Sequence, residues 1–104
     1  MAKFSIKAEP TFKAKVGFPI AGGDPVDVVL TFKHRTKDVL DDWVKARTEV
    51  KSDVESFMDM VSGWDLEDEF SKDNVEILLQ NHMGVSLAVF RAYLDQLVQN
   101  RRGN

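Results

Sequence analysis

Four carboxylates lie within the five residues that follow Trp64 in this 104-residue chain: Asp65, Glu67, Asp68 and Glu69. Carboxylate oxygens are ligands that Ca²⁺ prefers, but the EF-hand loop also needs a central glycine and a bidentate Glu at fixed positions. This segment lacks that pattern. We therefore expect a solvated acidic turn that also favours the start of the next helix. Docking of a basic partner protein is the functional alternative.

Histidines and serines offer no catalytic arrangement. His34 and His82 are the only histidines, neither stands in an HxxxH or HExxH pattern, and the chain has no cysteine. No serine lies in a nucleophile-elbow pattern, and Gly22-Gly23 lacks the surroundings of a phosphate-binding loop. We therefore expect no catalytic residue, no metal site, no cofactor and no small-molecule substrate.

Aromatic residues flank the acidic segment and recur in the last predicted helix. Trp64 and Phe70 either fill the corner between two helices or anchor a partner protein, since aromatic residues dominate binding hot spots. Phe90 belongs to an apolar stripe of the last predicted helix, with Tyr93 beside it, and this stripe could exceed what a small domain covers. Such a stripe would serve a partner helix or a second copy of the chain, so a homo-oligomer is possible.

Length and composition restrict the protein class. A chain of 104 residues predicts a single domain, 1–104, and 43% hydrophobic with 30% charged residues is typical of a folded protein. The net charge of −3 argues against nucleic acid as the main partner. No apolar run suits a signal peptide or a membrane helix, so we expect a cytoplasmic protein without a membrane partner.

The elements that must position these residues begin with two strands. Residues 11–18 and 26–33 both alternate apolar and polar side chains, and a Gly- and Pro-containing turn separates them. We predict an antiparallel hairpin within residues 1–35. Residues 36–104 form the helical segment of an α+β fold, in which a bundle of three to four α-helices follows the hairpin.

Capping residues predict the helix boundaries. Thr36 begins a helix that fades near Thr48, and Ser52 with Glu55 matches a capping box. Whether these are one bent helix or two stays open. We expect Gly63 to end this segment. Ser71 caps the next helix, and Gly84 ends it in the left-handed conformation. The last helix runs from Val85 to about Asn100, with its inner stripe formed by Leu87, Phe90, Leu94, Leu97 and Val98, beside Val89 and Tyr93.

The segment GWDLEDEFSKDNVEILLQNHMG and the closing Gly-Asn resemble the tail assembly chaperones of long-tailed bacteriophages and prophages. In that family a Gly-Trp-Asp segment precedes an acidic Glu-Phe-Ser helix start and a Leu-Leu-X-Asn-Tyr-Pro-Gly helix end. The matching residues are Gly63, Trp64, Asp65, Glu69, Phe70, Ser71, Leu78, Leu79, Asn81, Gly84, Gly103 and Asn104. His82 and Met83 depart from the Tyr-Pro of the pattern, and the N-terminal hairpin fits it only in general terms.

The resemblance implies a non-enzymatic protein that binds the tape measure protein and keeps it soluble before the tail tube forms. Partner contacts are then expected at Trp64, Asp65, Glu67, Glu69, Phe70, Phe90 and Tyr93. A structural minor tail or tail-completion protein is the alternative. A small DNA-binding regulator is a second alternative, although Arg91 is the only basic residue of the segment 85–98 that would serve as its recognition helix.

Overall fold

The computed structural model describes residues 4–47 and 52–99. Strands β1 (Thr11–Phe18) and β2 (Val26–Lys33) have the predicted bounds and pair antiparallel in a continuous register from Thr11↔Lys33 to Phe18↔Val26. Their connecting turn places Gly22 at φ 78°, a conformation that glycine adopts without steric cost. The predicted hairpin is therefore confirmed.

A third strand, β3 (Val61–Trp64), extends the sheet in the order β1-β2-β3. It pairs antiparallel with β2, with Gly63 opposite Thr31 and Trp64 opposite Leu30. The prediction that Gly63 ends a helix was wrong, because the helix stops at Met60 and Gly63 lies inside the strand. The helical segment 36–104 therefore contributes one strand to the sheet. The physical reason is burial: Leu30 and Phe32 of β2 are 0% exposed, and pairing with β3 supplies hydrogen-bond partners along the edge of β2 that β1 does not cover.

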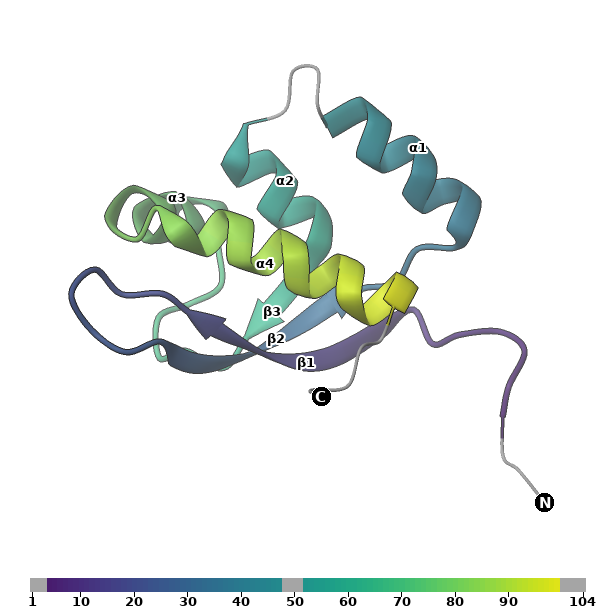
Figure 1. Cartoon of the computed structure of the whole chain (residues 1–104), viewed down its shortest axis with the longest axis horizontal. Helices are drawn as coiled ribbons and strands as arrows, with labels where there is room; N and C mark the ends of the chain where they lie inside the picture. Colours follow the sequence, from purple (N-terminus) through teal and green to yellow (C-terminus); the bar gives the residue numbers. More distant parts are fainter. Residues whose placement is uncertain (1–3, 48–51, 100–104) are drawn as a thin grey trace.

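Two helices link β2 to β3 (Figure 1). Helix α1 (Lys37–Arg47) begins directly after Thr36, whose carbonyl accepts from the Leu40 N–H at 2.8 Å. Helix α2 (Asp53–Met60) has the predicted capping box between Ser52 and Glu55. The two are separate elements, and the predicted fading near Thr48 lies outside the described residues.

Helix α3 (Lys72–Asn81) is capped by Ser71, whose hydroxyl accepts from the Asn74 N–H at 3.1 Å, as predicted. Gly84 does not end it. The C-cap of α3 is His82, and Gly84 is the first residue of α4 (Gly84–Leu94). Gly84 has no positive φ, so it does not adopt the predicted left-handed conformation. A π-helical turn, η1 (Asp95–Gln99), continues α4.

All four α-helices lie on one face of the three-stranded sheet in the described part of the chain (Figure 1). The inner side of α4 differs from the predicted stripe: Val85, Val89 and Tyr93 are buried, whereas Leu87 and Val98 are exposed. Val85, Val89 and Tyr93 are spaced by four residues, so they share the side of α4 that faces the core. Leu87 lies between Val85 and Val89 and therefore points to another side. One core unites the sheet and helices, formed by Val16, Phe18, Val28, Leu30, Phe32, Leu40, Trp43, Phe57, Met60, Val61, Val75, Leu79, Val85, Val89 and Tyr93.

Candidate partner-binding site

Trp64 closes the corner between β3 and α3. Its indole N–H donates to the Asp68 carbonyl oxygen at 2.7 Å, which folds the acidic segment back onto the ring. The Phe70 ring meets Trp64 edge to face with centroids 5.0 Å apart, and Phe57 lies behind at 6.4 Å. Trp64 and Phe70 are half-buried. The corner is therefore packed from inside, and part of each aromatic side chain still faces solvent.

Asp65 is tied to the sheet. Its backbone N–H donates to the Val29 carbonyl at 3.1 Å, and its Oδ1 accepts from the Val29 N–H at 3.0 Å. The carboxylate thus replaces a main-chain carbonyl and continues the pairing along β2 beyond Trp64. This role in the fold was not predicted, and it leaves less of the carboxylate for a partner.

Glu67, Asp68 and Glu69 are exposed on the turn that follows. The turn backbone is held from α3, since the Asn74 side-chain amide donates to the Glu69 carbonyl at 2.6 Å. Exposed carboxylates on an anchored turn present a fixed negative potential at the start of α3. This agrees with the predicted solvated acidic turn.

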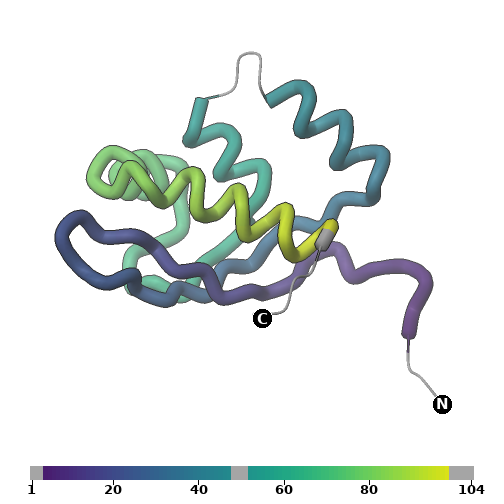
Figure 2. The backbone as a smooth tube through the Cα atoms, viewed as in Figure 1, coloured from purple at the N-terminus to yellow at the C-terminus, as the bar shows by residue number. Residues whose placement is uncertain are grey.

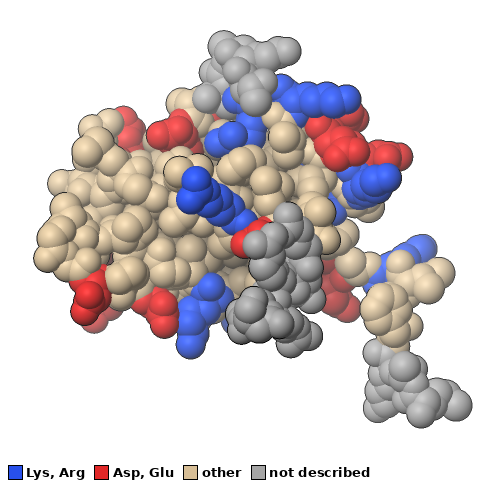
Figure 3. Space-filling model, in the orientation of Figure 1, with Lys and Arg blue, Asp and Glu red and all other residues tan. Residues whose placement is uncertain are grey.

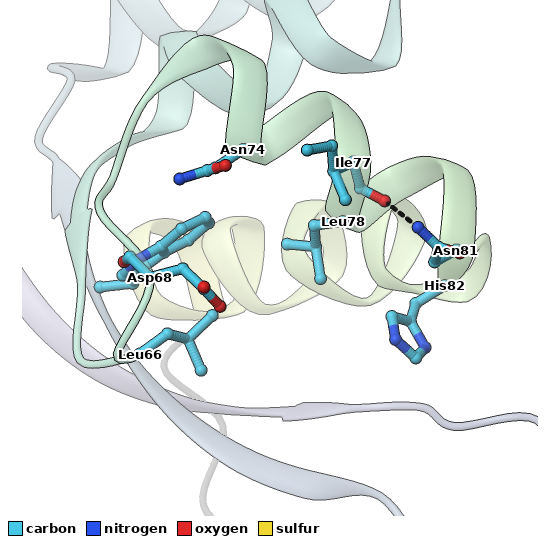
Figure 4. A pocket seen from close by; sticks show the side chains of 8 residues that line it. Leu66, Asp68, Asn74, Ile77, Leu78, Asn81 and His82 are labelled. Carbon is cyan, nitrogen blue, oxygen red and sulfur yellow. Dashed lines mark hydrogen bonds between the residues drawn. The ribbon is translucent and has the colours of Figure 1, made fainter.

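A hollow of about 450 Å³ opens between this turn and α3 (Figure 4). Leu66 and Asp68 lie on one side, and Leu78 and His82 project toward the same space from the helix. The remaining lining residues are Trp64, Asn74, Ile77 and Asn81. The amide of Asn81 donates to the Ile77 carbonyl at 2.8 Å, which fixes the rim near the end of α3.

A second hollow of about 250 Å³ adjoins the first and shares Leu66, Leu78 and His82 with it. Its other wall comes from the end of the hairpin and consists of Phe18, Pro19, Ile20, Val26 and Val28. Figure 2 shows this loop at the same end of the molecule as the turn between α3 and α4. We call the two adjoining hollows the end groove. It is the feature of this site best suited to bind an apolar surface.

Phe90 and Tyr93 lie in a different aromatic cluster. The Tyr93 ring packs on Phe12, Phe32 and Trp43 at centroid distances of 6.4, 5.4 and 5.7 Å, and Phe90 packs on Trp43 at 6.1 Å. Tyr93 has an exposed fraction of 0%, so the folded molecule offers it to no partner. The sequence spacing predicted that Tyr93 lies beside the inner stripe of the last helix. In the structure the Tyr93 side of α4 faces the core.

The Tyr93 hydroxyl is also a hydrogen-bonding centre. It donates to the Lys33 carbonyl at 2.6 Å and accepts from the Arg35 guanidinium at 2.9 Å. Burial raises the pKa of this hydroxyl, although the hydrogen bond from Arg35 opposes the shift. The network fixes α4 against the end of β2 and performs no evident chemistry.

Sequence reasoning missed most of the end groove. Ile77 of α3 lines this groove and is 58% exposed. Val75 and Leu79 are buried and lie four residues apart on one side, so Ile77, midway between them, necessarily lies on the other. That spacing was the available signal. No sequence signal predicted that Ile20 and Val26 line one hollow with Leu66 and Leu78, because that arrangement depends on how the hairpin packs against α3 and the acidic turn.

Within residues 4–47 and 52–99, no group of three or more His, Asp or Glu side chains could hold a metal ion. Among the same residues, no helix combines the length and apolar character needed to cross a membrane.

A family model described as phage tail assembly chaperone matches residues 1–104. No curated protein and no solved structure matches the chain.

Proposed function

The chain belongs to the phage tail assembly chaperone family, and we propose that it binds the tape measure protein of its phage or prophage and keeps that protein soluble until the tail tube forms. Family membership supports a chaperone role in tail assembly and hence a protein partner. The identity of this partner as the tape measure protein, and action by binding alone in the bacterial cytoplasm, are parts of the proposal.

The end groove is the observation that carries the proposal. Ile20, Val26 and Ile77 line the groove, and their side chains are 39%, 49% and 58% exposed. Met83 follows the lining residue His82 in the chain and is 84% exposed. Contiguous exposed apolar surface commonly marks an interaction site. A chaperone needs such a surface, since it must cover apolar side chains that would otherwise drive the partner to aggregate.

Co-expression tests the proposal. The tagged protein is produced together with the tape measure protein of the same phage or prophage, and the amount of soluble tape measure protein is compared with and without it. We expect the partner to co-purify with the tag and to enter the insoluble fraction when this protein is absent.

A partner that stays soluble alone and does not co-purify would contradict the proposal. Finding this protein in purified virions at a ring-like copy number would then favour a structural tail component. Size-exclusion chromatography with light scattering on the same preparation measures the homo-oligomeric state, which stays a prediction.

A further inference from the structure

The end groove lies between two acidic segments that are distant in sequence. Residues 19–27 and 64–82 contain eight of the 17 Asp and Glu residues but only one of the 14 Lys and Arg residues. The fold brings these segments together, since Ile20 and Val26 share a hollow with Leu66 and Leu78. The acidic excess at this end is therefore a property of the tertiary structure.

The lining of the groove contains one acidic side chain and no Lys or Arg among the described residues. Asp68 is the only charged Asp, Glu, Lys or Arg side chain among the described residues that line its two hollows. At the left end of the face drawn in Figure 3 the surface is mainly uncharged, with Asp and Glu toward its edges and no Lys or Arg. Beside the apolar lining of the groove, the carboxylates of Glu67, Asp68 and Glu69 are exposed.

We propose that the end groove accepts an amphipathic α-helix whose apolar face is flanked by Lys or Arg. This inference rests on the proposed function and identifies the kind of tape measure segment that would be bound. Apolar residues of the helix would contact Leu66, Ile77 and Leu78, while its basic residues would face Glu67 and Asp68.

A helix suits this groove because its backbone hydrogen bonds are satisfied within the helix itself. Polar backbone groups placed against an apolar surface need hydrogen-bond partners, and a helix satisfies its own. The walls are mainly side chains of α3, the acidic turn and the hairpin end, so they select for apolar side chains at helical spacing. The exposed carboxylates beside the groove would exclude an amphipathic helix with acidic flanks, because like charges would then face each other.

A synthetic helix with Leu at positions i, i+3, i+4 and i+7 and Lys elsewhere is the probe. Two peptides control for it: one with each Lys replaced by Glu, and one with the same composition scrambled so that no apolar face forms. Fluorescence polarisation of labelled peptides measures the dissociation constants against the full-length protein. We expect binding only of the amphipathic basic peptide, and weaker binding as salt increases.

Two pairs of variants locate the contact. Ile77→Glu places a charge in the groove, whereas Val39→Glu makes the same change on α1 at a residue 53% exposed. Glu67→Lys with Asp68→Lys reverses charge beside the groove, and Asp41→Lys with Asp42→Lys makes the same net change on α1. We expect about tenfold or greater loss of affinity for each groove variant and less than about twofold for each control.

Amide chemical shifts of the unaltered protein give a reading that does not depend on folding of any variant. On addition of the basic peptide we expect changes at residues 19–26 and 64–82 together. Changes confined to other segments would overturn the inference, as would equal affinity for the Glu peptide or equal losses in groove and control variants.

Tape measure capture separates the two proposals. If the groove variants still capture the tape measure protein, the groove inference fails and the chaperone proposal stands. If the unaltered protein binds the basic helix at the groove but captures no tape measure protein, the chaperone proposal fails and the groove still has its ligand class. An extended peptide that binds more tightly than the helical one would contradict the helical form of the ligand.

Discussion

Gly84 lies against Pro19, and a β-carbon built at position 84 would stand 2.8 Å from the Pro19 Cγ. This contact joins the first residue of α4 to the end of β1, next to the hairpin wall of the end groove. Real β-carbons do not approach other heavy atoms so closely. The glycine is therefore required by packing, whereas the sequence had suggested a left-handed helix end.

Gly84→Ala tests this contact. In an unobstructed helix the change would stabilise by about 0.5–1 kcal/mol. Here we expect a loss of about 1–3 kcal/mol, because the added methyl group displaces Pro19 or α4. Urea unfolding measures the effect. Pro19→Ala removes the obstructing Cγ. Adding Gly84→Ala to the Pro19→Ala variant should therefore lower the free energy of unfolding by less than Gly84→Ala does in the unaltered protein. Simple additivity would show that the two residues are not coupled.

Tyr93→Phe tests the buried hydrogen bonds. The variant keeps the ring in the aromatic cluster but leaves the Lys33 carbonyl without the Tyr93 donor and the Arg35 guanidinium without this acceptor. We expect the free energy of unfolding to fall by about 1–3 kcal/mol, measured by chemical denaturation. Because Tyr93 is buried, capture of the partner by the folded variant should not change.

Alkaline pH should destabilise the protein through the same hydroxyl. Burial raises the pKa of Tyr93 above its ordinary value of 10.0, so the native state keeps a proton that the unfolded chain has lost. The free energy of unfolding therefore falls as pH rises from about 10 toward the native pKa. The chain has a single tyrosine, so the ultraviolet absorbance of tyrosinate reports this group alone. Tyr93→Phe should show a shallower alkaline decline, and an identical decline would exclude Tyr93 as the cause.

Trp64→Ala with Phe70→Ala tests the aromatic corner as a contact surface. We expect weaker capture of the tape measure protein, since Trp64 lines the end groove and Phe70 supports its ring. Circular dichroism and thermal unfolding must first show that the double variant is folded, because both residues also pack against the core. Undiminished capture by a folded double variant would remove these two residues from the binding site.

Local patterns predicted the elements that depend on neighbouring residues. The alternation in residues 11–18 and 26–33 gave both strands with their observed bounds, and Ser52 and Ser71 marked two helix starts. Each of these features depends on backbone and side-chain preferences within a few residues. The acidic turn after Trp64 was predictable for the same reason.

The sequence by itself determined the two hairpin strands, the capped helices and, through the residues around Trp64, the resemblance to the family. Only the tertiary structure decided that Val61–Trp64 completes the sheet, that Tyr93 is in the core, and that Ile20 and Val26 meet Leu66 and Leu78. These features depend on which surfaces meet after the chain folds. A short strand gains its hydrogen bonds from β2, and the end groove gains its walls from segments more than 35 residues apart in the sequence.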